Sequence, residues 1–158
     1  MSKSYLNAGL LLLRAGIGVA LVSHGYPKLF GGEGKQAHPA LTKLYGKNFQ
    51  ASVERSGPAA FAKGLERMEI PMPELAAYAS GAAEFGGGLA LALGLLTRLT
   101  APVVLVNMLV AIRKAHWANG FSGQGGFEMP SLFAIIAATL ALTGPGKYSL
   151  DGLLNRLR

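Results

Sequence analysis

Two ionisable residues of opposite charge, Arg14 and Glu84, lie near the middle of two apolar stretches that are long enough to cross a membrane. The stretches cover about residues 5–24 and 75–96. A charge at the centre of a bilayer costs at least ~2.5–3.5 kcal/mol on insertion scales, so such a residue usually faces protein and finds a partner. We therefore expect Arg14 and Glu84 to contact each other inside a helical bundle and to mark a functional site.

Two further apolar stretches, at about 99–117 and 130–143, complete a set of four expected membrane spans. The last one is short for the ~20 residues that a perpendicular span needs, and a buried helix of a soluble bundle is the alternative for it. The chain holds 22 glycines, many of them inside these stretches, and membrane helices tolerate glycine because it lets backbones approach closely. We expect an all-α fold: one domain over residues 1–158, forming an integral membrane four-helix bundle.

The connections between the spans carry their own signals. The long polar segment 28–74 joins the first two spans, and we expect short helices in it at 41–53 and 59–68. Only Thr97 and Arg98 join the second and third spans, which predicts an antiparallel hairpin. A Gly-Pro-Gly sequence after residue 143 should end the last span, and residues 151–157 should follow as a short surface helix.

Composition excludes several classes of function. The net charge is +7, but the basic residues are spread among segment ends and one loop, without a basic and aromatic platform, so we expect no nucleic acid partner. The chain has no cysteine, which excludes thiol chemistry, Fe–S ligation and a cysteine zinc site. The first apolar stretch lacks the pattern of a cleavable signal peptide, and we expect it to remain as a helix.

Residue counting places several polar side chains at one depth. If the outer ends of the spans are level, Arg14, Glu84, Asn107 and Thr139 all lie about 14–16 Å from those ends at the helical rise. One interpretation is a buried ion pair that only fixes helix register. The other is a polar cavity that binds an anion, a quinone head group or a proton.

A second group of polar residues gathers at the expected outer rim of the bundle. Two histidines at one depth on two helices could bind haem or a metal, but histidines hydrogen-bonded at helix ends are the simpler interpretation, and we predict no metal site. Trp117 fits an anchor at the membrane interface. The residues of this rim are His24, Lys28, Glu74, Arg113, Lys114, His116 and Glu128.

Short motifs in order along the chain resemble the DoxX family of small bacterial membrane proteins. They include RAGIG at 14–18, HGYPKL at 24–29, EFGGG at 84–88 and GPG at 144–146. The resemblance implies a four-helix protein of the bacterial inner membrane, multi-pass, with both termini in the cytoplasm. It also implies a link to redox chemistry, because relatives named DoxD are associated with thiosulfate:quinone oxidoreduction.

The function we expect is that of a quinone-linked membrane oxidoreductase component. Its catalytic residues would be Glu84, which accepts a proton, Arg14, which holds an anionic species, and His24. The cofactor would be a non-covalently bound quinone, and electrons would come from a redox-enzyme subunit or a substrate. Alternatives are a small-molecule binding or transport protein and a structural membrane partner of a soluble redox enzyme. Besides the lipid bilayer, a small-molecule ligand and a second copy of the chain are partners that these hypotheses leave open. The residues expected to bind substrate are Lys28, Asn107, Arg113, His116 and Glu128.

Overall fold

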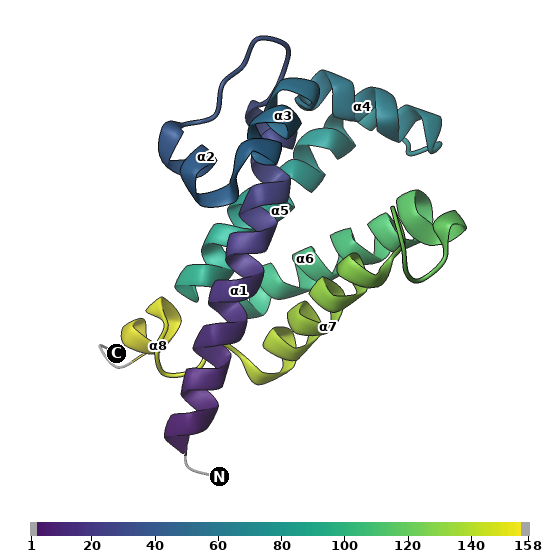
Figure 1. Ribbon diagram of the computed structural model, residues 1–158. Helices are drawn as coiled ribbons and strands as arrows, with labels where there is room; N and C mark the ends of the chain where they lie inside the picture. Colours follow the sequence, from purple (N-terminus) through teal and green to yellow (C-terminus); the bar gives the residue numbers. More distant parts are fainter. Residues whose placement is uncertain (1–2, 156–158) are drawn as a thin grey trace. The chain divides into compact units, whose positions relative to one another are not determined.

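The computed structural model describes residues 3–155, and every regular element in that range is a helix (Figure 1). The all-α prediction is thereby confirmed for the described chain. A π-helical turn, Ile112–His116, and a 3₁₀ turn, Trp117–Asn119, continue the sixth helix. The helices are α1 (Lys3–Phe30), α2 (Pro39–Tyr45), α3 (Lys47–Arg55), α4 (Pro58–Arg67), α5 (Pro73–Leu93), α6 (Thr97–Ala111), α7 (Glu128–Thr143) and α8 (Leu150–Leu154).

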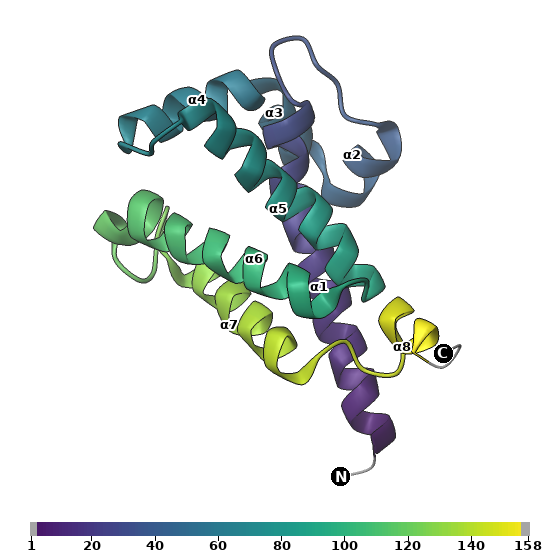
Figure 2. The same cartoon turned by 180° about the vertical axis from the view of Figure 1, so that it is seen from behind.

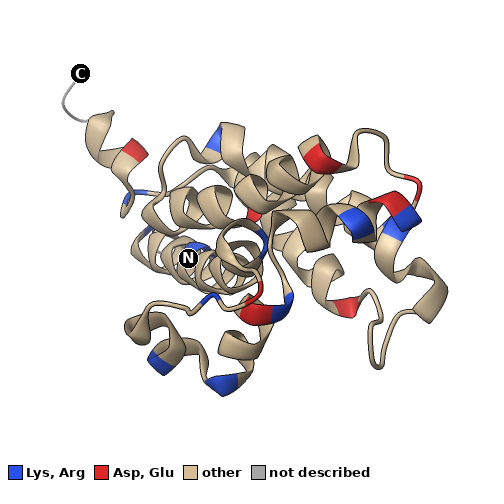
Figure 3. Ribbon diagram, turned by 90° about the horizontal axis from the view of Figure 1, so that it is seen from above, with Lys and Arg blue, Asp and Glu red and all other residues tan. Residues whose placement is uncertain are grey.

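Two of these segments are long and apolar enough to cross a membrane, namely Lys3–Phe30 and Thr97–Asn119. Helix α7 is apolar too but shorter. Most of the ribbon carries no charged residue, as expected for helices that meet hydrocarbon (Figure 3). The first and third apolar stretches of the sequence therefore have the length and composition predicted for them.

Helix α1 continues beyond the end that the apolar stretch suggested. We expected the first span to end near His24, but the helix runs through Pro27 to Phe30. Proline removes one backbone donor inside a helix, so the extra turns need packing to hold them. Tyr26 and Phe30 supply it, with ring centroids 5.1 Å apart, and Tyr26 packs on Phe49 at 5.6 Å. The extension places Lys28 one turn after His24 on a single helix.

The other connections differ from expectation in detail. The helix predicted at 41–53 is split into α2 and α3 at Gly46, whose φ of 86° favours glycine. The turn between α5 and α6 lies at residues 94–96, so Thr97 and Arg98 begin α6 instead of forming the turn. Gly144 ends α7 with a φ of 76°, as the sequence predicted. Helix α8 covers part of the helix expected at 151–157, and residues 156–158 lie outside the described residues.

The described residues form two compact units. The loop unit is Leu21–Gly86, and the hairpin unit consists of the described residues before and after it, 3–20 and 87–155. In the hairpin unit α6 and α7 lie side by side along their lengths (Figures 1 and 2). Its buried side chains include Ile17, Leu91, Val104, Ala137 and Leu140.

The loop unit has an aromatic and aliphatic core of its own. Phe49, Val53 and Ala37 are buried at its centre, and Tyr26 and Tyr45 pack against them. The rings of Tyr45 and Phe49 lie 4.9 Å apart. Burial raises the pKa of the Tyr45 hydroxyl above its ordinary value, because the charged phenolate is poorly solvated there. This core fixes α2 and α3 against the last two turns of α1.

Glycines bring the backbones of α1 and α5 into direct contact within each unit. In the loop unit a Cβ on Gly25 would overlap the backbone of Phe85. In the hairpin unit a Cβ on Gly18 would lie 2.6 Å from the carbonyl oxygen of Gly88. Small residues on these faces therefore serve helix packing, as the sequence indicated.

Candidate functional site

A buried ion pair between Lys28 and Glu84 is the centre of the loop unit's polar chemistry. The Nζ atom of Lys28 on α1 lies 2.6 Å from Oε1 of Glu84 on α5. The Glu84 side chain is 5% exposed and the Lys28 side chain 23%. A carboxylate at this burial is strongly disfavoured without a counter-charge, and the short contact supplies one. The long apolar stem of lysine lets the ammonium reach Glu84 while part of the side chain stays at the surface.

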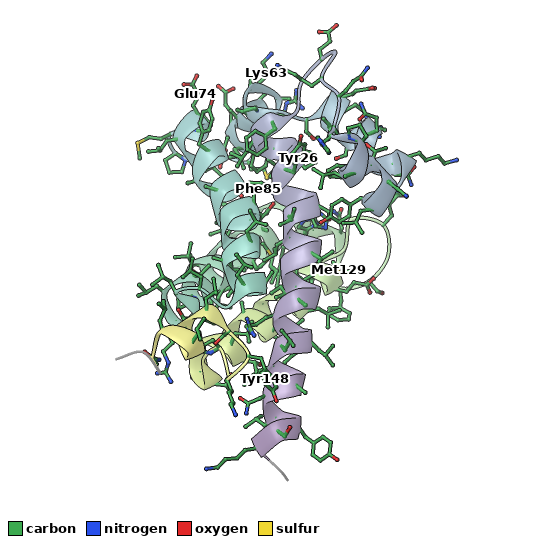
Figure 4. All side chains as sticks on the ribbon, turned by 90° about the vertical axis from the view of Figure 1, so that its left-hand side faces the viewer. Tyr26, Lys63, Glu74, Phe85, Met129 and Tyr148 are labelled. Carbon is green, nitrogen blue, oxygen red and sulfur yellow. The ribbon has the colours of Figure 1, made fainter. Side chains whose placement is uncertain are left out.

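Aromatic rings surround this ion pair. The Lys28 ammonium lies 4.6 Å from the ring centroid of Phe61 on α4, which gives it a cation–π contact as well as a carboxylate. Phe85, the residue after Glu84, meets Phe30 edge to face at 5.1 Å and Tyr26 at 6.0 Å (Figure 4). These ring contacts hold the middle of α5 against the last turns of α1.

His24 belongs to the same cluster. It lies one turn before Lys28 on α1, and it interacts electrostatically with both Glu84 and Lys28. Its side chain is exposed at the surface of the structure, whereas Glu84 is buried. The loop unit therefore brings together three of the predicted site residues, one of them accessible and one enclosed. Such an arrangement can pass a proton between the surface and the carboxylate.

The partner predicted for Arg14 is wrong. Its guanidinium, fully buried in the hairpin unit, donates from Nη1 to the carbonyl oxygen of Ala92 at 3.3 Å and from Nη2 to that of Tyr148, in place of the carboxylate of Glu84. Arg14 thus meets α5 eight residues after Glu84, about 12 Å along the helix. The prediction assumed level outer ends, but α1 continues past His24 to Phe30, and this displaces the register.

Arg14 belongs to a set of contacts that fastens the segment after α7. We call residues 144–151 the C-terminal strap. Asn7 accepts a hydrogen bond from the backbone N–H of Lys147 at 2.7 Å. The carboxylate of Asp151 accepts from the N–H groups of Leu96 at 2.8 Å and Thr97 at 2.9 Å, which caps the start of α6.

Sequence reasoning missed the roles of Asn7, Tyr148 and Asp151. A polar asparagine within the first apolar stretch was a usable signal, because Asn7 and Arg14 are seven residues apart and share one helix face. Ser149 and Asp151 were also recognisable as a helix start, since Ser149 accepts from the N–H of Gly152 at 2.9 Å. Nothing local in the sequence indicates that this short helix would cap α6.

The remaining predicted residues lie in the hairpin unit. Asn107 is half-buried on α6, and Thr139 donates to the carbonyl oxygen of Ile135 on its own helix at 2.8 Å. His116 lies at the π-helical turn, where its Nδ1 donates to the carbonyl oxygen of Gly125 at 2.8 Å. Arg113 and Glu128 are exposed. The ligand-binding roles of Asn107, Arg113, His116 and Glu128 stay predictions, as does a catalytic role for Arg14.

The described part of the chain holds no group of three or more His, Asp or Glu side chains arranged to bind a metal. The polar groups of the Glu84 cluster are the Glu84 carboxylate, the Lys28 ammonium and the His24 imidazole. Such a set suits hydrogen bonds to an organic carbonyl or the movement of a proton.

Comparison with known proteins shows which family the chain resembles. The DoxX family model matches residues 9–117. The chain is 30% identical over 151 residues to the uncharacterized membrane protein Rv3486 of Mycobacterium tuberculosis, covering 83% of this chain and 89% of that one. It is 36% identical over 84 residues to the inner membrane protein YqjF of Escherichia coli, covering 46% of this chain and 57% of that one. No solved structure matches the chain.

Proposed function

This chain belongs to the DoxX family of membrane proteins, and we propose that it is the membrane component of a quinone-linked oxidoreductase, with Glu84, Lys28 and His24 as its working site. The observation that carries the proposal is the buried Lys28–Glu84 ion pair, with its 2.6 Å contact. An ionisable residue at membrane depth is expensive to keep and usually serves a function.

The three side chains have complementary roles in this proposal. The Lys28 ammonium donates a hydrogen bond to a quinone carbonyl oxygen, where negative charge grows as electrons arrive. Glu84 holds the ammonium in place and takes up or releases a proton. His24 is exposed, and its imidazole can exchange protons with the surroundings.

The balance of the reaction requires a second component. Reduction of a quinone to a quinol takes up a pair of electrons and a pair of protons. In our proposal a redox-enzyme subunit bound to this chain supplies the electrons. The protons enter from the surroundings through His24 and pass to the quinone by way of Glu84. The quinone is bound without a covalent bond.

We propose a four-span arrangement for the same protein, with α1, α5, α6 and α7 crossing the bacterial inner membrane. Helix α5 has 21 residues, about 31 Å at the helical rise, which matches a hydrocarbon core of about 30 Å. Helix α7 has 16 residues and needs local thinning of the bilayer. Lys3, Arg98 and Lys147 lie at the ends or turns that share one side, which favours termini in the cytoplasm.

The test uses the full chain purified in detergent. A soluble quinone analogue should raise the unfolding temperature of the unaltered protein and of a Glu74→Gln control, but not that of Glu84→Gln. Glu74 is the matched control because it is an exposed glutamate at the start of the same helix. If the analogue raises the unfolding temperature of all three proteins equally, Glu84 is not part of a quinone site. If the analogue gives no shift in any of them and the chain co-purifies with a soluble redox enzyme, the structural-partner alternative is the better account.

A further inference from the structure

The hairpin unit carries an apolar groove of about 620 Å³ between α1 and α7. From α1 it is lined by one face that includes Leu6, Leu13 and Gly16, and from α7 by Phe133 and Ile136. No side chain fills the space beside Gly16, since a Cβ there would have no neighbour within 4 Å. The groove belongs to a unit whose helix α1 is long and apolar enough to cross a membrane, so hydrocarbon is its expected surrounding.

The length of the groove fits one leaflet of a bilayer. Its α1 side runs from Tyr5 to Ile17, a distance of twelve residue steps or about 18 Å at the helical rise. Half the hydrocarbon thickness of a bilayer is about 15 Å. A single acyl chain of a phospholipid therefore has about the right length to lie along the groove.

Three basic residues lie at one end of this groove, where α1 and α6 begin and α7 ends. Lys147 donates its backbone N–H to Asn7 on the first turns of α1. Gly144 follows the groove residue Thr143, and a Cβ on Gly144 would lie 3.3 Å from Nε of Arg98. Lys3 begins α1, two residues before Tyr5.

Among the described residues, no acidic side chain neutralises these cations. Within residues 3–155 the side chains of Lys3, Arg98 and Lys147 form no ion pair and no hydrogen bond. Asp151 is the acidic residue of the C-terminal strap, and both of its carboxylate oxygens already accept backbone hydrogen bonds at the start of α6. The end of the groove therefore offers three positive charges to an anion.

We propose that this groove binds an anionic phospholipid, with one acyl chain between α1 and α7 and the phosphate at Lys3, Arg98 and Lys147. Basic residues beside transmembrane helices attract anionic head groups in this way. Two observations point to this occupant. The three basic residues at the end of the groove match the negative charge of the phosphate, and the length of the groove matches an acyl chain in one leaflet. The site is separate from the Glu84 cluster and does not depend on quinone chemistry.

The head-group test compares two lipids with identical acyl chains on the full chain in detergent. Phosphatidylglycerol should raise the unfolding temperature more than phosphatidylcholine. The triple variant Lys3→Gln, Arg98→Gln, Lys147→Gln should lose this difference between the two lipids. Its affinity for phosphatidylglycerol should fall about 100-fold, because each basic residue contributes roughly fivefold. The matched control, Lys43→Gln, Lys47→Gln, Lys63→Gln, removes the same charge from exposed positions in the loop unit and should keep the difference.

The acyl-chain test fills the groove. Gly16→Leu should lower binding of phosphatidylglycerol, measured by native mass spectrometry, whereas Gly86→Leu should not. Both glycines are exposed on long helices with no neighbour within 4 Å of a Cβ, so both variants are expected to fold.

Four results would overturn the proposal. They are equal stabilisation by the two lipids, equal losses in the two triple variants, stabilisation by inorganic phosphate alone, and unchanged lipid binding in Gly16→Leu. Loss of a dimer on Gly16→Leu, measured by light scattering, would assign the groove to contacts between copies of the chain instead.

Discussion

The guanidinium of Arg14 donates a hydrogen bond to the backbone carbonyl of Tyr148, which ties the middle of α1 to the C-terminal strap. In Figure 4 Tyr148 lies beside α1. A second donor of Arg14 bonds Ala92 on α5, so one side chain holds three segments together. The planar fork of arginine suits two acceptors at once, which a lysine ammonium matches poorly.

Arg14→Lys should therefore destabilise the protein although it keeps the charge. Loss of one charged hydrogen bond in a buried site costs about 1.5–3 kcal/mol. The measurement is thermal unfolding in detergent, with Arg98→Lys as the control, because Arg98 is exposed. Equal unfolding temperatures for the two variants would show that the contacts of Arg14 contribute little.

Asp151→Ala should loosen the start of α6. The variant removes both acceptors from the N–H groups of Leu96 and Thr97, and loss of a helix cap costs about 0.5–2 kcal/mol. Hydrogen exchange of peptides covering residues 95–100 should become faster, and less so in Asp151→Asn, which keeps one acceptor oxygen. Unchanged exchange in the alanine variant would contradict the capping role.

Gly25→Ala should cost stability that Gly9→Ala does not. A Cβ on Gly25 would overlap the backbone of Phe85, which cannot move without separating α1 from α5 in the loop unit. Overpacking of this kind costs about 1–3 kcal/mol. Gly9 lies on the same helix with open space beside it, so alanine there should be neutral or slightly stabilising. Chemical or thermal unfolding of the two variants decides between these outcomes.

Local patterns in the sequence predicted the helices but not the register between them. The apolar stretches around Arg14 and Glu84 are visible in any short window, and α1 and α5 form there. The pairing of Glu84 with Lys28 depends on the six residues by which α1 outlasts its predicted end at His24. Those turns are held by packing on Phe49, a residue from a distant segment, and no window of sequence contains that contact.

The same limit explains the partners of Arg14. Its acceptors are backbone carbonyls, which carry no residue-type signal, and one of them lies 134 positions away in the chain. A buried charge could be recognised from sequence, because charge in an apolar stretch is rare. Its partner could not be recognised from sequence, because any backbone carbonyl at the right place can accept a hydrogen bond from a guanidinium.

Lys28 and Glu84 should be energetically coupled. Removing either alone, as Lys28→Met or Glu84→Leu, strands the other charge in a buried site and should cost about 3–5 kcal/mol. The double variant should cost less than the sum of the two, because neither charge is then left without its partner. A double-mutant cycle on unfolding free energies measures this, and strict additivity would contradict the buried ion pair.

A quinone site at the Lys28–Glu84 ion pair is tested by the affinity of a quinone analogue for the Lys28→Met, Glu84→Leu double variant. The affinity is determined by equilibrium binding on the folded full chain. We expect this variant to lose binding while the unaltered protein and Glu74→Gln keep it. Full retention of affinity in a double variant that folds would contradict a quinone site at this ion pair and leave it a structural role alone.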